Sequence, residues 1–197
     1  AFRAAGDVER AAEAATVAAR FSWFAGDRAG TDRYIEAALE LVGSGPDSRA
    51  KAEAFTNQSG FLMLAGRFDE SIQVGAEAFP LVEELGMEAQ RARLHIVVGC
   101  ARCSLGDSEG LREIETGISI ARAAGALEMV VLGYTNLASE LIFFGRLADA
   151  RLAWQHFREL GERYGFARMQ RTARTDGACW AFVDGRWDDV LRVADEL

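Results

Sequence analysis

Apolar residues recur at helical spacing along the chain, and the stretch before Gly145 shows this clearly. Leu132, Leu137 and Leu141 follow one another at intervals of five and four, which places them on one face of an amphipathic α-helix. No proline interrupts the stretch, and glycine readily takes the left-handed conformation that closes many helices. The pattern therefore predicts a helix over 127–144.

A second helix is predicted directly after this glycine. Asp149 lies in its first turn, where the helix dipole favours a negative charge. Trp154, Phe157 and Leu160 then continue the apolar pattern up to the next glycine. We expect this helix over 148–164, and together the two segments form a helix hairpin.

Glycines repeat the hairpin along the whole chain. One set is Gly26, Gly66, Gly106, Gly145 and Gly185, with separations of 40, 40, 39 and 40 residues. A second set falls between them and consists of Gly45, Gly86, Gly125 and Gly165, with separations of 41, 39 and 40 residues. A fixed period of this kind is typical of repeat architectures. The expected helix pairs are 8–25 with 29–43, 48–65 with 69–85, 88–105 with 108–124, 127–144 with 148–164, and 167–184 with 187–197.

The spacing predicts an all-α, right-handed solenoid of about five antiparallel helix hairpins, which forms a single domain over 1–197. Stability in such arrays is spread over contacts between neighbouring units. Pro80 lies inside the second helix of the second unit, so we expect a kink or an early helix end there. The chain does not begin with methionine, and we interpret it as part of a longer protein.

Two positions before the first turn glycine keep one residue type in most units. Seven residues before it the side chains are small, which lets paired helices approach closely; they are Ala19, Ser59, Gly99, Ala138 and Ala178. Ten residues before it the units carry Thr16, Thr56, Ile96, Thr135 and Thr175. The four threonines are too regular for a random solvent-facing surface.

The residues of the fourth unit resemble the tetratricopeptide repeat. The matching positions are Tyr134, Leu137, Ala138, Leu141, Gly145, Ala150 and Trp154. The other units replace the alanine after the turn by Thr31, Ser71, Leu111 and Val190, and their period of 40 exceeds the family's ~34. The resemblance implies helix hairpins whose first helices line a concave groove.

Two further segments, 160–167 (Leu-Gly-Glu-Arg-Tyr-Gly-Phe-Ala) and 185–190 (Gly-Arg-Trp-Asp-Asp-Val), resemble repeat regions of large bacterial ATP-binding, LuxR-type transcriptional regulators. This resemblance implies a non-catalytic interaction module that acts as the sensor or scaffold region of a regulator. The alternative is an assembly or oligomerisation module of another multidomain signalling protein, such as a cyclase.

By analogy with the repeat family, the groove should carry the ligand-binding residues. The candidates are Thr16, Arg20, Thr56, Asn57, Arg102, Thr135, Asn136, Thr175 and Asp176. An asparagine amide can donate to and accept from an extended peptide backbone at once, which favours Asn57 and Asn136 as contacts. The other interpretation is that the threonines and asparagines hydrogen-bond to neighbouring backbone.

Composition limits the partners. The net charge is −8, which argues against direct nucleic-acid binding, and no apolar run has the ~18–20 residues of a membrane span. Three cysteines form no disulfide framework and favour the cytoplasm. We expect a peptide, a protein or a small inducer in the groove, contacts with other domains of the same chain, and a homodimer through the array ends as a further option.

The sequence offers no set of residues for catalysis. Cys100 and Cys103 form a single C-x-x-C without a second pair, and the same helix position accepts other small residues. His95 and His156 lie on different helices without a nucleophile motif, and Lys51 belongs to no phosphate-binding loop. We therefore expect no enzyme activity, no catalytic residue, no metal site and no cofactor.

Overall fold

The computed structural model describes residues 6–164 and 177–195, which are helical and contain no strand. The helices are α1 (Val8–Phe24), α2 (Arg28–Val42), α3 (Arg49–Leu64), α4 (Phe68–Glu84), α5 (Glu88–Ser104), α6 (Glu109–Ala123), α7 (Leu127–Phe143), α8 (Leu147–Tyr164) and α10 (Trp187–Asp195). Residues 177–183 are also helical. Every boundary predicted between residues 8 and 164 lies within one residue of the observed boundary. The all-α hairpin fold is confirmed.

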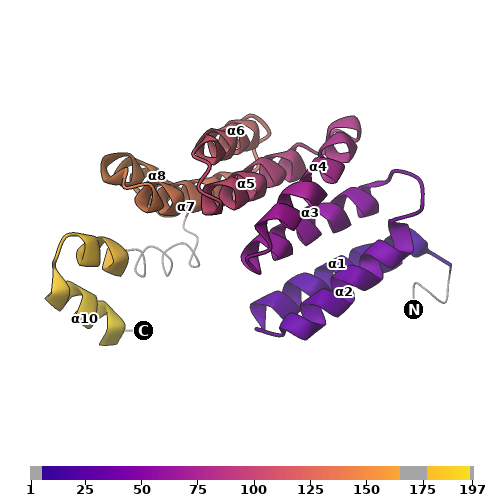
Figure 1. Cartoon of the computed structure of the whole chain (residues 1–197), viewed down its shortest axis with the longest axis horizontal. Coiled ribbons are helices and arrows are strands. Elements are labelled where there is room, and N and C mark those ends of the chain that lie inside the picture. Colours follow the sequence, from indigo (N-terminus) through magenta and orange to yellow (C-terminus); the bar gives the residue numbers. More distant parts are fainter. Residues whose placement is uncertain (1–5, 165–176, 196–197) are drawn as a thin grey trace.

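Successive helices pair as hairpins that lie side by side along the array (Figure 1). Helices α1, α3, α5 and α7 also pack against one another in that order. Helices α2, α4 and α6 each pack on their hairpin partner and on the next odd-numbered helix instead. The odd-numbered helices thus form a continuous row, and we call its solvent-facing side the inner face. The even-numbered helices form the outer row.

Left-handed glycines end the first helix of each described hairpin, as predicted. Their φ angles lie between 70° and 85° at Gly26, Gly66, Gly106, Gly145 and Gly185. In the second set, Gly86 and Gly125 also have positive φ angles, of 61° and 65°. Gly45 does not, because the segment between α2 and α3 is a longer connection rather than a tight turn. Gly165, the last of the second set, lies outside the described residues.

The two helices of a hairpin come closest where small residues face each other. A Cβ atom added to Gly99 of α5 would lie 2.7 Å from the backbone oxygen of Gly110 on α6. The equivalent crossing of α3 and α4 holds Ser59 and Ser71, whose buried hydroxyls each donate to the other residue's carbonyl oxygen, at 2.9 and 2.8 Å. Small side chains at this position therefore set the spacing of the hairpin helices.

Apolar side chains fill the space between the rows in several clusters rather than one central core. The cluster between α5 and α8 includes Ile96, Ile114 and Phe157, each at most 2 % exposed. Separate clusters lie between α3, α4 and α5 and between α1, α2 and α3. This division is expected for an array in which each hairpin contacts only its neighbours.

Pro80 does not end its helix. The prediction of an early end is wrong, because α4 continues through this residue to Glu84. Proline removes one helix hydrogen bond. The residues directly after it, Leu81 and Val82, are buried against the core, and their packing favours continuing the helix. Among the described residues, no helix is long and apolar enough to cross a membrane.

We predict that Gly99→Ala destabilises the protein by about 2 kcal/mol, because the new methyl group overlaps the backbone of α6. Chemical denaturation monitored by circular dichroism measures this loss. Gly177→Ala is the control, since its Cβ would meet no atom within 4 Å. Equal stability of the two variants would contradict the close-approach interpretation.

Candidate functional site

Three of the predicted groove threonines lie in the described residues, on α1, α3 and α7; Thr16 and Thr56 are buried and Thr135 is half-buried. Thr56 is 1 % exposed, and its hydroxyl donates to the Ala52 carbonyl oxygen at 2.7 Å. Thr135 makes the same bond to Val131 at 2.9 Å. The Thr16 hydroxyl is enclosed without a hydrogen-bond partner. Two of the three hydroxyls are thus used by their own helices.

The two asparagines leave their acceptor oxygens unused. Their Nδ2 atoms donate to the Glu53 and Leu132 carbonyl oxygens, at 2.8 and 2.9 Å. Asn57 is buried, and its Oδ1 atom is enclosed with no hydrogen-bond partner. Asn136 is half-buried. The inner face therefore carries amide oxygens that the chain itself does not satisfy.

The two predicted arginines have different surroundings. Arg102 donates through Nε to Asp107 at 2.8 Å and lies 2.7 Å from it through Nη2, so the turn after α5 neutralises it. Arg20 on α1 is exposed and pairs with no acid among the described residues. Thr175 and Asp176 lie outside the described residues. That these residues bind a ligand stays a prediction.

Arg93 on α5 is an inner-face residue that sequence reasoning missed. Its guanidinium group reaches α3, where a Cβ atom added to Gly60 would lie 3.3 Å from Arg93 Nη2. The Nε atom is enclosed and has no hydrogen-bond partner. Within the described parts of the chain, Arg93 forms no ion pair. Glycine at position 60 leaves the space that the guanidinium occupies.

The charge of Arg93 is destabilised by its surroundings. Burial, and after it the positive charge of Arg20, lowers the pKa of Arg93 to about 10. Arg20 and Gly60 both stand six residues before their turn glycines, so they hold equivalent positions on neighbouring helices. The equivalent repeat positions of Arg20 and Gly60 were a sequence signal for this pair of arginines. The signal alone was not enough, because the sequence does not show that Arg93 extends across α3.

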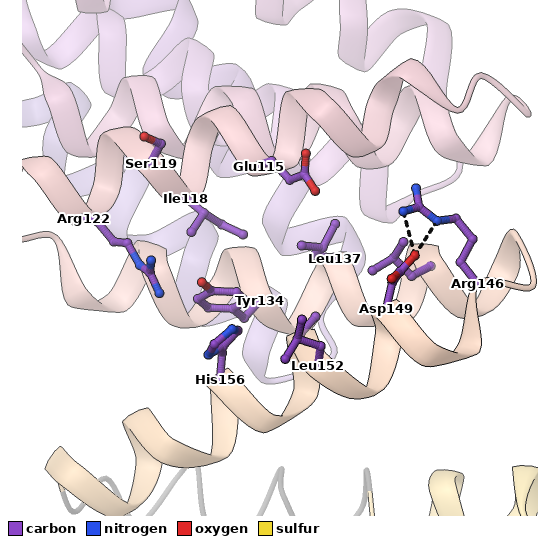
Figure 2. Close-up of a pocket in the computed structure, with 12 residues that line it drawn as sticks. Glu115, Ile118, Ser119, Arg122, Tyr134, Leu137, Arg146, Asp149, Leu152 and His156 are labelled. Atoms are coloured by element: carbon purple, nitrogen blue, oxygen red, sulfur yellow. Dashed lines mark hydrogen bonds and ion pairs between the residues drawn. The ribbon is translucent and has the colours of Figure 1, made fainter.

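A cavity of about 410 Å³ lies on the outer side, between α6, α7 and α8. Figure 2 shows Arg122 and His156 on either side of Tyr134, with Glu115 and Ser119 extending from α6. Ile118, Leu137, Leu152 and Ala153 are among its apolar lining residues. We call this cavity the outer pocket; its volume is within the range of small-molecule sites.

Ring and charge contacts fix the ends of the outer pocket. The guanidinium carbon of Arg122 lies 5.3 Å from the Tyr134 ring centroid, and the His156 ring centroid lies 5.2 Å from it. At the other end, Arg146 Nε donates to Asp149 Oδ2 at 2.8 Å (Figure 2). The outer pocket thus combines an apolar floor with polar side chains at both ends.

The cysteines and His95 have structural surroundings. Cys100 and Cys103 are buried, and burial raises the pKa of both thiols, that of Cys103 to about 12. Cys179 is exposed. His95 Nδ1 lies 3.0 Å from Glu113 Oε1, and its ring packs on Phe79. In the described residues, no group of three or more potential ligands lies together as a metal site would require.

Comparison with known proteins shows similarity of fold alone. No family model and no curated protein matches the chain. The crystal structure of aspartyl phosphate phosphatase F from Bacillus subtilis superposes with a TM-score of 0.78 over 97 % of this chain, at 10 % sequence identity. The chain spans 50 % of the length of that protein. At this identity the match supports the helical-repeat architecture.

We predict that one of the three cysteines reacts rapidly with a thiol reagent at pH 8. Cys100 and Cys103 stay protonated at this pH because their pKa values are raised, and burial shields them, whereas Cys179 is exposed. Absorbance during reaction with Ellman's reagent counts the rapid thiols, and Cys179→Ser should remove the rapid phase. Three equally rapid thiols would show that α5 is not packed as described.

Proposed function

We propose that the chain is a non-catalytic interaction module whose inner face binds an extended segment of another protein. The carrying observation is that two enclosed polar atoms there, Asn57 Oδ1 and Arg93 Nε, have no hydrogen-bond partner, beside the exposed and unpaired Arg20. Buried polar groups in folded proteins are normally hydrogen-bonded, and each one that is not costs about 1–3 kcal/mol. A ligand that supplies the missing partners would recover part of this cost.

An extended polypeptide fits these groups because its backbone is not hydrogen-bonded internally. Its N–H groups can donate to the amide oxygens of Asn57 and Asn136, and acidic groups on it can pair with the arginines. The continuous packing of α1, α3, α5 and α7 provides a surface several helices long. The fold match to aspartyl phosphate phosphatase F, a protein named for its action on aspartyl phosphate, is compatible with recognition of a protein partner.

The proposal also covers the kind of larger protein in which this module acts. The segments 160–167 and 185–190 resemble repeat regions of LuxR-type regulators, which favours a sensor or scaffold role in a bacterial transcriptional regulator in the cytoplasm. An assembly module without a ligand is the alternative. The unsatisfied groups favour the sensor, because a surface that served only to hold helices together would gain stability by losing them.

We predict that peptides selected from a random display library bind about thirtyfold more weakly to the Asn57→Ala, Asn136→Ala double variant. The substitutions remove two acceptors for ligand N–H groups, each worth about 1 kcal/mol. Isothermal titration calorimetry with the selected synthetic peptides measures the change.

Gln155→Ala, an exposed substitution on the outer helix α8, is the matched control and should bind like the unmodified protein. Unchanged binding in the asparagine double variant would show that the selected peptides do not use the inner face.

A further inference from the structure

Two arginines on the inner face lack a counter-charge in a protein that is acidic as a whole. The net charge is −8, and most described arginines pair with a nearby carboxylate, as Arg67 does with Glu70 and Arg146 with Asp149. Arg20 and Arg93 form no such pair within the described ranges. The like charge of Arg20 is the nearby charge that acts on Arg93. Both positive charges are therefore without an ion pair in the described part of the chain.

The two guanidinium groups belong to one place on the inner face. Arg93 extends from α5 over Gly60 of α3. Arg20 holds the position on α1 that Gly60 holds on α3, and both α1 and α5 pack on α3. Asn57 stands one turn before Gly60 on the same side of α3. Arg93 thus covers the backbone of α3 at Gly60, and Arg20 stands at the equivalent position of the neighbouring helix.

We propose that Arg20 and Arg93 bind a phosphate group carried by the protein segment that the inner face receives. The proposal rests on the proposed function and names the chemical group that the segment presents. A bound phosphate monoester carries about −1.5 to −2 charges, which matches two guanidinium groups, whereas a carboxylate carries one. Its three oxygens also accept from two planar N–H forks, the geometry in which arginine binds anions most strongly.

No ion pair engages either arginine in the described residues, and Glu53, the acid on the neighbouring turn of α3, accepts from Gln90 instead. A buried cation without a partner destabilises the fold, and removing it commonly stabilises a protein. We therefore expect Arg93→Met to raise the Tm of the protein measured without phosphate. A structural role for Arg93 would give the opposite sign.

The test measures binding of small probes to the full chain. Inorganic phosphate, O-phosphoserine and glutamate are titrated at equal ionic strength, with the Tm and calorimetric heat as readouts. We expect phosphate at a tenfold excess over its Kd to raise the Tm by about 3 °C. Arg93→Met and the exposed variant Arg20→Gln should each weaken phosphate and phosphoserine binding at least tenfold. Glutamate should bind at least tenfold more weakly than phosphoserine.

Arg91→Met is the matched control. Arg91 lies on the same helix and also has an enclosed Nε atom, but it pairs with Glu88 at 3.0 Å. This variant should keep the full response to phosphate. Arg20 is exposed, so we expect Arg20→Gln to fold normally. This variant therefore still tests the proposal if Arg93→Met fails to fold.

Four outcomes would overturn the assignment. Equal phosphate responses in the unmodified protein and both arginine variants would indicate a general salt effect. Glutamate binding as strong as phosphoserine binding would indicate a carboxylate site. Binding of inorganic phosphate without phosphoserine would indicate a site for the free ion. Loss of the phosphate response in Arg91→Met as well would remove the specific role of the pair.

The selected peptides separate this inference from the proposed function. If their binding depends on Asn57 and Asn136 while phosphate has no effect, the arginine assignment is wrong and the peptide-binding function stands. If phosphate binds through the arginines but no peptide depends on the asparagines, the inner face binds anions and the proposed function is wrong.

Discussion

Close contact between paired helices at small residues is the constraint on which this array depends. At Gly99 and Gly110 the two backbones leave no room for a side chain, and at Ser59 and Ser71 they leave room only for hydroxyls that bond across the gap. This spacing brings each even-numbered helix against its partner along its length. The odd-numbered helices can then pack in a row, with their other side open as the inner face.

The helix boundaries of the hairpins could be predicted to within one residue because each is determined by residues close to it in the sequence. A left-handed turn needs glycine, so the positions of Gly26, Gly66 and Gly106 mark where helices end. The early helix end predicted at Pro80 was wrong because the burial of Leu81 and Val82, which favours continuing the helix, depends on neighbouring helices and not on the local sequence. The connection after α2 departs from the period because Gly45 does not form the expected turn.

The candidate site was harder to predict because it combines residues from helices far apart in the sequence. The repeat position of Asn57 identified it as a candidate. The sequence did not predict that its Nδ2 donates to the Glu53 carbonyl oxygen and leaves Oδ1 without a partner. Arg93 was missed because its importance arises from Gly60 and Arg20, which belong to two other helices. The outer pocket arises in the same way, where side chains of three helices leave a space that no single helix pattern reveals.

The inner face carries a buried arginine that no acid neutralises. Many of the other described arginines pair with a nearby acid, as Arg158 does with Glu162, and such exposed pairs contribute little free energy. Around Arg93 the chain retains a positive charge that its own acids do not balance. Proteins commonly retain such local instability at sites where a ligand supplies the missing interaction.

The most direct measurement is an NMR titration of the arginine Nε–Hε signals with inorganic phosphate. A guanidinium group that donates to an anion shifts its Hε resonance downfield, so the experiment reports on each arginine separately. The account predicts a saturable shift of the Arg93 and Arg20 signals while the Arg91 signal, already paired with Glu88, stays in place. Signals of Arg93 and Arg20 that do not move, or arginine signals that all move together, would contradict it.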